Sequence, residues 1–177
     1  MLKLNFLGTS AGMPTKQRNV TALAVSLVCA EQTPKKTPWL LVDCGEGTQH
    51  QLLKTPLSMM QLEVIAITHL HGDHCFGLIG LISTLGMLGR TADIEIHAQP
   101  DLEALLRPQI DYFCGEFPFQ VKFHPFSPYQ SAVIYEDRSV TVTTIPLKHR
   151  APSVGFLFEE KALERHLVRS MVESYDI

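Results

Sequence analysis

The sequence predicts a single layered α/β domain of 177 residues. Short apolar or alternating runs that suit strands dominate the first part of the chain, and strands then alternate with helical patterns. Glycine-rich segments follow several of these runs and indicate turns at the strand ends. With 45% hydrophobic residues and a mean hydropathy near zero, the chain can bury one sizeable core, and no internal repeat divides it.

The beginning of the chain predicts three strands and the turns between them. An alternating run at residues 2–6 predicts the first strand, and the glycine-rich residues 8–12 end it with a turn. Apolar residues predict a second strand at 20–28 and a third at 39–42. The polar residues 31–38 between them contain two prolines and indicate a hairpin loop.

The next elements alternate between helix and strand. Thr48 follows a glycine-rich turn at residues 43–47, and we expect it to be the N-cap of a short helix that ends near Leu53. Residues 64–68 form an apolar run that suits a buried strand. Residues 77–88 predict a helix, whose glycines would let it pack closely on the sheet.

A second α/β unit follows, and then a group of strands. Residues 94–97 predict a strand, and Pro100 with Asp101 opens a helix that we expect to end near Arg107. Residues 136–138 indicate a tight turn. The remaining strands are expected at residues 121–123, 131–135, 140–145 and 154–158.

The sequence His-Leu-His-Gly-Asp-His, which follows the buried strand, predicts a metal site. In an extended segment, side chains two residues apart point the same way, so His69 and His71 can bind one cation together. Gly72 allows a sharp turn, after which Asp73 and His74 can face a second cation. Imidazoles with a carboxylate suit zinc or, with less specificity, manganese and iron. The alternative is a polar loop with solvated histidines, but the density of ligand types after a strand favours metal binding.

Two residues at other predicted strand ends can complete this site. Asp43 can accept the second ring N–H of a metal-bound histidine, although it could also be a turn aspartate that bonds its own backbone. A cation held by His69 and His71 needs at least one more ligand. His149 also follows a predicted strand and is the best-placed candidate, with a solvated loop histidine as the alternative.

The other histidines give weaker signals. His97 also ends a predicted strand, but we expect a structural or substrate-lining role for it rather than ligation. His50, His124 and His166 have no companion groups in the sequence, and we expect no special role for them.

The loop between the first two strands contains Pro14, Lys16, Arg18 and Asn19 and is basic. A Lys/Arg pair is usually part of a solvated turn. This loop, however, lies at the same end of the sheet as the glycine-rich turn before it, where backbone N–H groups and cations would suit a phosphate.

The composition limits the partners and the compartment. A net charge of −3 and a pI near 6.2 give no overall sign of nucleic-acid binding, so such a partner would have to be held by a local basic patch. The widely spaced cysteines indicate reduced thiols in a cytosol, and Cys75, next to His74, is expected to be a buried small residue rather than a ligand. The first residues do not resemble a signal peptide, and the longest apolar stretch cannot span a bilayer. We therefore expect a cytoplasmic protein with no membrane partner.

Five motifs of this chain occur together in one known family. They are Gly-Thr-Ser-Ala-Gly at 8–12, Pro-x-Lys-x-Arg-Asn at 14–19, Asp-Cys-Gly-Glu-Gly-Thr at 43–48, Thr-His-Leu-His-Gly-Asp-His at 68–74 and Pro-Leu-x-His at 146–149. The set resembles ribonuclease Z, the tRNA 3′-processing endonuclease of the metallo-β-lactamase superfamily. The histidine-rich motif marks only the superfamily, which includes lactamases, thioesterases and sulfatases, whereas the first three motifs narrow the resemblance to ribonuclease Z.

The resemblance implies a metallo-β-lactamase αββα sandwich with two zinc ions at its edge. By it, His69, His71 and His149 bind one ion, Asp73 and His74 bind the other, and Asp73 also accepts the proton of the attacking water. The loop residues associated with reading the tRNA 3′ end are Pro14, Lys16, Arg18 and Asn19. The implied reaction removes the 3′ trailer from precursor tRNA and leaves a 3′-hydroxyl. The implied partners are precursor tRNA and a second copy of the chain.

The resemblance covers the N-terminal part of this family. Residues 1–161 correspond to part of the metallo-β-lactamase-like domain, and an amphipathic helix in residues 162–177 corresponds to the start of a tRNA-binding arm. The family's second half supplies a bridging aspartate and further histidines that have no counterpart here. We therefore expect this chain alone to hold a second zinc weakly and to be inactive. The alternatives are another hydrolase of the superfamily, such as a sulfatase or phosphodiesterase, and an inactive fragment with a structural role.

Overall fold

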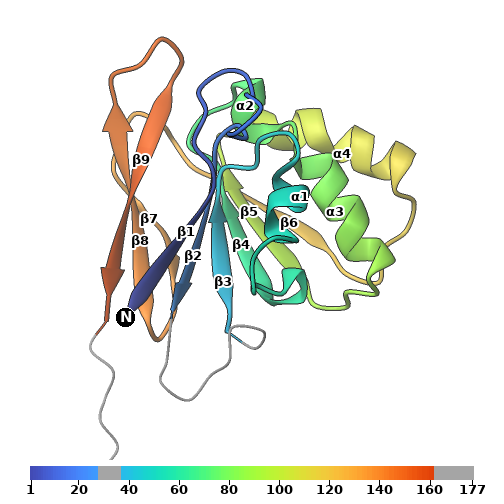
Figure 1. The fold of residues 1–177 in the computed structure, drawn as a ribbon. Coiled ribbons are helices and arrows are strands. Elements are labelled where there is room, and N and C mark those ends of the chain that lie inside the picture. The colour runs from blue at the N-terminus through green and yellow to red at the C-terminus, as the bar shows by residue number, and fades with distance from the viewer. Residues whose placement is uncertain (28–36, 162–177) are drawn as a thin grey trace, which may run out of the picture.

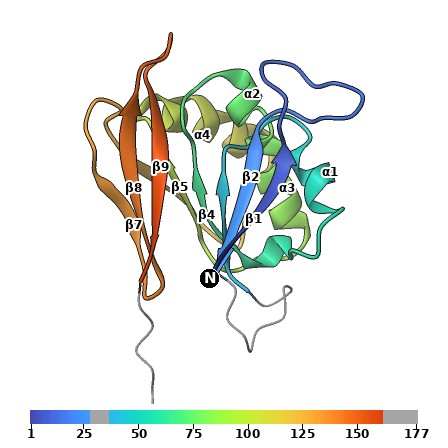
Figure 2. The ribbon, with the colours of Figure 1, turned by 60° about the vertical axis from the view of Figure 1, so that its left-hand side comes forward.

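Two β-sheets lie face to face in the computed structural model, which describes residues 1–27 and 37–161 of the chain (Figure 1). Helices cover the outer face of the first sheet, so the described residues form three layers of helices, first sheet and second sheet (Figure 1, Figure 2). Within these residues no helix covers the outer face of the second sheet. The helix predicted for residues 162–177 lies outside the described residues.

The first sheet has the strand order β1-β2-β3-β4-β5-β6. Its strands are β1 (Leu2–Gly8), β2 (Ala22–Leu27), β3 (Trp39–Val42), β4 (Leu62–Ala66), β5 (Ile94–Ala98) and β6 (Val121–Pro125). The first three strands are antiparallel, whereas β3, β4, β5 and β6 are parallel to one another. Because the parallel strands point the same way, the turns that follow β3, β4 and β5 meet at one edge of the sheet.

The second sheet has the order β7-β8-β9 and is antiparallel. Its strands are β7 (Val133–Glu136), β8 (Val140–Leu147) and β9 (Ser153–Glu160). The helices are α1 (Thr48–Leu52), the 3-10 turn η1 (Met59–Gln61), α2 (Gly72–Cys75), α3 (Leu78–Met87) and α4 (Asp101–Phe113). None of the described helices is long and apolar enough to cross a bilayer.

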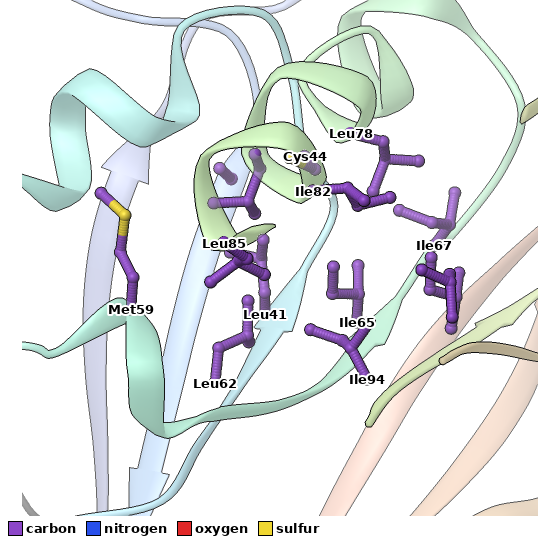
Figure 3. Packing of buried hydrophobic residues seen from close by; sticks show 14 of the residues in the cluster. Leu41, Cys44, Met59, Leu62, Ile65, Ile67, Leu78, Ile82, Leu85 and Ile94 are labelled. Carbon is purple, nitrogen blue, oxygen red and sulfur yellow. The ribbon is translucent and has the colours of Figure 1, made fainter. Parts of the chain in front are cut away.

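The main core lies between the first sheet and α3. Leucines and isoleucines recur on α3 at helical spacing, and this stripe is fully buried. Figure 3 shows these α3 side chains against residues of the sheet strands: Leu78, Ile82 and Leu85 opposite Leu41, Leu62, Ile65 and Ile94. Each such fully buried side chain contributes roughly 1.5–3 kcal/mol through removal of apolar surface from water. This packing fixes the start of α3, and with it the residues between β4 and α3.

A second, smaller cluster joins the two sheets. Leu40 and Val64 point from the first sheet towards Val140 and Val142 of β8, and all four are buried. Side chains alternate between the two faces of a strand, so β3 and β4 supply both clusters at once. The second sheet is held against the first by this contact, which sets where the connection between β8 and β9 lies.

The helix α4 continues past the end that the sequence predicted. The sequence predicts an end near Arg107, but α4 runs to Phe113 and contains Pro108, which has no backbone N–H to donate. Buried Leu106 and Ile110 lie on either side of the proline and pack on the sheet. The side-chain amide of Gln109 donates to the carbonyl of Leu105, 2.7 Å away. Tertiary packing therefore outweighs the local cost of the proline.

Thr48 is not the N-cap of α1. Gly47 holds that position with φ +74°, and Thr48 is the first residue of the helix. The Thr48 hydroxyl donates to the carbonyl of Gly45 at 2.6 Å, so it closes the preceding turn instead of capping the helix. The left-handed backbone at this position favours glycine.

Candidate metal centre

Three histidine rings converge at the edge of the first sheet where β4 ends. His69 and His71 follow β4, and His149 lies in the connection between β8 and β9. Nε2 of His69 lies 2.9 Å from Nδ1 of His71, and the ring centres of His69 and His149 are 5.0 Å apart. One ligand nitrogen from each ring lies within 4.8 Å of the other two. The structure thus brings together the three histidines that the sequence grouped, and their binding of an ion stays a prediction.

Two hydrogen bonds hold the β8–β9 connection and the start of β9 beside the first sheet. The backbone N–H of Val154 donates to the carbonyl of Thr68, which directly precedes His69, at 3.1 Å. The side-chain amide of Gln99, just after β5, donates to the carbonyl of Pro152 at 2.7 Å. His149 is therefore brought to the other histidines by contacts that are distant in the sequence.

His69 is buried and stays neutral at neutral pH. Burial, and next the neighbouring His74 and His71, lower its pKa to about 4. Its Nδ1 lies 3.0 Å from the hydroxyl oxygen of Thr68, which leaves Nε2 facing His71. A neutral imidazole with one nitrogen so oriented is ready to bind a cation without first losing a proton.

Asp43 joins two parts of the histidine-rich segment. It follows β3, is buried, and has a left-handed backbone with φ 57°. One carboxylate oxygen accepts the backbone N–H of Thr68 at 2.8 Å, and the other lies 2.8 Å from Nδ1 of His74. Burial by itself would lower the pKa of His74, but the hydrogen bond to Asp43 and the charge of that carboxylate raise it. Asp43 therefore orients His74 through its Nδ1 and leaves Nε2 available.

Asp73 and His74 form a second pair of ligand groups beside the three histidines. Nε2 of His74 lies 3.5 Å from Oδ2 of Asp73, and the rings of His69 and His74 have centres 4.0 Å apart. Oδ2 of Asp73 also accepts the backbone N–H of Gly12 at 2.8 Å. Burial by itself would raise the pKa of Asp73, but the hydrogen bond from Gly12 and the neighbouring His74 lower it more strongly. The pKa is therefore below its usual value, and the carboxyl group is ionised at neutral pH.

The turn after β3 is packed directly on the start of α3. The backbone N–H of Cys44 donates to the carbonyl of His74 at 2.7 Å, and the N–H of Gly77 donates to the carbonyl of Cys44 at 2.9 Å. A Cβ on Gly77 would lie 2.2 Å from the carbonyl oxygen of Gly45, and a Cβ on Gly45 would lie 2.5 Å from the carbonyl oxygen of Asp73. Glycine is required at both positions because two backbones meet there. The sequence predicts close packing of a glycine-containing helix on the sheet, but no local pattern indicates this particular contact.

The basic loop lies at the same edge as the histidines. Figure 1 and Figure 2 show the connection between β1 and β2 beside α2. Pro14, Lys16 and Arg18 are exposed, and neither cation forms an ion pair with any of the described residues. The amide of Asn19 donates to the carbonyl of Glu46 at 2.8 Å, which ties the loop to the turn after β3.

Cys75 is partly buried against the main core, whereas the sequence predicts a buried residue at this position. Its Sγ lies 3.0 Å from the carbonyl oxygen of His71. Burial, and then the charges of Asp43 and Asp73, raise the pKa of this thiol to about 11. A thiol that stays protonated is a poor metal ligand.

Residues 38–166, well over half of the chain, match the family model described as the β-lactamase superfamily domain. The chain belongs to the β-lactamase superfamily. This membership confirms the fold class that the sequence predicted.

Several relatives within the superfamily carry the name that the motifs suggested. The chain is 48% identical to "Ribonuclease Z" of Bacteroides fragilis over 175 residues, which are 99% of this chain and 55% of that protein. It is 46% identical to "Ribonuclease Z" of Phocaeicola vulgatus, again over 99% of this chain and 54% of that protein. A crystal structure of human tRNase Z, short form, is similar with a TM-score of 0.75 and 32% identity, over 90% of this chain and 65% of that chain. The resemblance to ribonuclease Z is therefore confirmed, and the chain spans about half the length of the curated relatives it matches.

Proposed function

We propose that this chain carries the histidine-rich half of a zinc-dependent endoribonuclease that removes the 3′ trailer from precursor tRNA and leaves a 3′-hydroxyl. The observation that carries the proposal is the convergence of His69, His71 and His149 beside the Asp73–His74 pair. The same sheet edge presents Lys16 and Arg18, which form no ion pair with the described residues, and a phosphodiester needs both kinds of group. The relatives named ribonuclease Z supply the substrate class.

The donor set fits zinc. Three imidazole nitrogens that face one point are a common zinc ligand set, and a fourth position remains for water or substrate. Zinc bound there would polarise the phosphodiester and lower the pKa of an attacking water. A second ion would have Asp73 and His74 as its ligands among the described residues, which is too few for firm binding by this chain alone.

Each polar residue of the site has its own role in the proposed reaction. Asp73 is ionised and accepts the proton of the attacking water, and the N–H of Gly12 fixes the orientation of its carboxylate. Asp43 contacts no substrate and holds His74 in place.

The basic loop binds the substrate in this proposal. Lys16 and Arg18 bind backbone phosphates near the tRNA 3′ end, which positions the scissile bond. Pro14 restricts the backbone of the loop, and Asn19 anchors the loop to the turn after β3.

The assembly and the division of the chain are part of the same proposal. Residues 1–161 form the N-terminal part of the catalytic domain, and residues 162–177 begin an arm that holds tRNA. The enzyme works in the cytoplasm as a homodimer. Reduced thiols agree with that compartment, since the described cysteines Cys44, Cys75 and Cys114 are free.

The proposal is tested by incubating the protein that contains residues 1–177 with a 5′-labelled precursor tRNA. We expect cleavage to one product with a 3′-hydroxyl, loss of cleavage after chelation, and recovery when zinc is returned. The 177-residue chain alone should cleave little or nothing. Preferential hydrolysis of a small phosphodiester or sulfate ester would identify a different hydrolase of the superfamily. A zinc-loaded protein that cleaves neither precursor tRNA nor these small esters would indicate a structural role instead.

A further inference from the structure

A second group of metal-ligand side chains lies on the face of β5 and β6 that points away from the helices. Glu95 and His97 alternate with buried Ile94 and Ile96, which pack on the helical side. His97 is paired with His124 in the register of the two parallel strands. The two rings stack with centres 4.6 Å apart and planes 15° from parallel. This group shares no residue with the site formed by His69, His71 and His149.

Both rings direct the same nitrogen at one carboxylate oxygen. Nε2 of His97 lies 3.4 Å from Oε2 of Glu95, and Nε2 of His124 lies 3.7 Å from the same atom. Hydrogen bonds to a carboxylate are shorter, at ~2.7–2.9 Å, so these contacts are too long to be good direct bonds. Two ring nitrogens that face one carboxylate oxygen at these distances leave room for an ion between the three atoms.

We propose that Glu95, His97 and His124 bind a divalent transition-metal ion such as zinc. Bonds of ~2.0–2.2 Å at tetrahedral angles place the ligand atoms of one zinc ion about 3.3–3.6 Å apart. The distance from Glu95 to His97, 3.4 Å, lies within that range, and the distance to His124, 3.7 Å, lies just above it. All three ligand atoms lie within 4.8 Å of one another. Two imidazoles and a carboxylate are a common zinc ligand set, and copper and nickel also accept them.

The surroundings leave these ligands available. Lys122 lies beside Glu95 on the neighbouring strand, but its ammonium group pairs with Asp93 at 2.6 Å. The Tyr135 ring approaches His97 edge-on with centres 6.2 Å apart, and its hydroxyl faces Asp137. The side chain of His97 is 5% exposed, whereas those of Glu95 and His124 are 40% and 44% exposed. An ion can therefore enter from solvent and keep a water as its fourth ligand.

A bound ion would join the two outer strands of the parallel part of the sheet. β5 and β6 are linked through backbone hydrogen bonds, and the ion adds a cross-strand bond at the end of that ladder. The carbonyl of His97 accepts the backbone N–H of Ile67 at 2.9 Å, two residues before His69. The site would thus stiffen the strand that supports the histidine-rich segment, without entering the reaction itself.

The test compares zinc binding by variants of the whole chain that differ at this group alone. The starting protein carries His71→Ala and His149→Ala, which remove two ligands of the first site. Equilibrium dialysis against zinc, and the visible absorption of added cobalt(II), then count the ions that remain. We expect one equivalent in this background and its loss when His124→Ala is added. Glu95→Gln should weaken binding by more than about tenfold, because a neutral amide replaces the charged ligand.

His50→Ala is the matched control, because His50 is an exposed histidine on α1 that lies outside both groups. It should leave the zinc stoichiometry unchanged. Circular dichroism checks that each variant is folded. If His124→Ala does not fold, the test rests on Glu95→Gln. The inference is overturned if the background protein binds no zinc, or if His124→Ala and Glu95→Gln bind as much zinc as the control. Neither outcome depends on tRNA cleavage, so the inference and the proposed function can fail separately.

Discussion

Asp43 has an unusual place among the residues of the site, because it binds no ion in our proposal and yet holds both ends of the histidine-rich segment. Its backbone lies in the left-handed region, which few residues other than glycine, asparagine and aspartate adopt readily. Its carboxylate contacts the backbone and hydroxyl of Thr68 and the ring of His74. Asparagine keeps the size and tolerates the same backbone, so Asp43→Asn isolates the effect of the charge.

In the metal-free protein, Asp43→Asn should lower the pKa of His74, because the charge that raises it is removed. A raised pKa in the folded state stabilises the protein below the unfolded value of ~6.5, and this contribution is lost as the pH rises through the folded value. The variant should therefore lose more free energy of unfolding at about pH 5.5 than at about pH 8.5, in addition to ~1–3 kcal/mol from unmade hydrogen bonds.

Titration of the His74 ring by NMR and urea unfolding at the two pH values measure these effects. Asp111→Asn, an exposed change on α4, is the control and should alter neither quantity. An equal loss of stability at both pH values would show that the carboxylate does not act through the charge of His74.

Asp73 and the basic loop should affect different steps of the reaction. Asp73→Asn should lower the single-turnover cleavage rate by about 10²–10⁴-fold with little change in tRNA affinity, because the amide cannot accept a proton. Lys16→Ala with Arg18→Ala should weaken binding and reduce its dependence on salt, because two phosphate contacts are lost. Cleavage of 5′-labelled precursor tRNA and a binding titration at two salt concentrations separate the two effects.

The control for the loop removes the same charge elsewhere. Lys3→Ala with Arg138→Ala changes two exposed cations, one at the start of β1 and one in the β7–β8 turn. This pair should leave the salt dependence as it is in the unchanged protein. A loop variant with an unchanged salt dependence and a slower chemical step would contradict the assignment of roles.

At the scale of elements, the contact between the turn after β3 and the start of α3 holds the site together. The carbonyl of Cys44 accepts the N–H of Gly77, and Gly45 lies against the carbonyl of Asp73. The buried leucines of α3 fix the helix on the sheet. This contact therefore fixes the proposed ligands relative to α3.

Gly77→Ala should therefore destabilise the protein and weaken zinc binding together. The added Cβ would lie 2.2 Å from a backbone oxygen that cannot move away cheaply, and overpacking of this kind costs ~1–3 kcal/mol. Urea unfolding and zinc titration measure both effects.

Gly80→Ala on the same helix is the matched control. Its Cβ would meet only the side-chain amide of Gln49, at 3.2 Å, and alanine favours a helix, so stability should stay within about 1 kcal/mol. If the two variants behaved alike, the close approach of the backbones at Gly77 would not be what holds the site.

At the scale of the whole molecule, ion binding should stabilise the fold, because the ligands come from parts of the chain that are separate when it unfolds. At a zinc concentration of about 100 times the dissociation constant, one site adds ~2.7 kcal/mol. For a domain of this size that raises the melting temperature by roughly 5–10 °C. Thermal unfolding with zinc and with a chelator measures the shift. His71→Ala with His149→Ala should remove the part of the melting-temperature shift that comes from the first site. An unchanged shift in this variant would show that the stabilising ion binds elsewhere.

Much of the fold could be predicted from local patterns. Alternating or apolar runs located the nine strands of the described residues to within a few residues, because such a run is a property of each strand alone. The histidine-rich segment was found for the same reason, since its ligands lie within six residues of one another. The end of α4 was missed because the burial of Leu106 and Ile110 on the sheet decides whether a helix continues through Pro108.

The sequence by itself determined the elements and the main cluster of ligand types, whereas the tertiary structure decided which distant groups meet. His97 and His124 lie on neighbouring strands in register, yet 26 positions and a helix separate them in the chain, so His124 appeared to have no companions. Asp43 meets His74, and Cys44 meets Gly77, for the same reason. Which parallel strands pair depends on how the whole core packs, and no short segment of the sequence determines it.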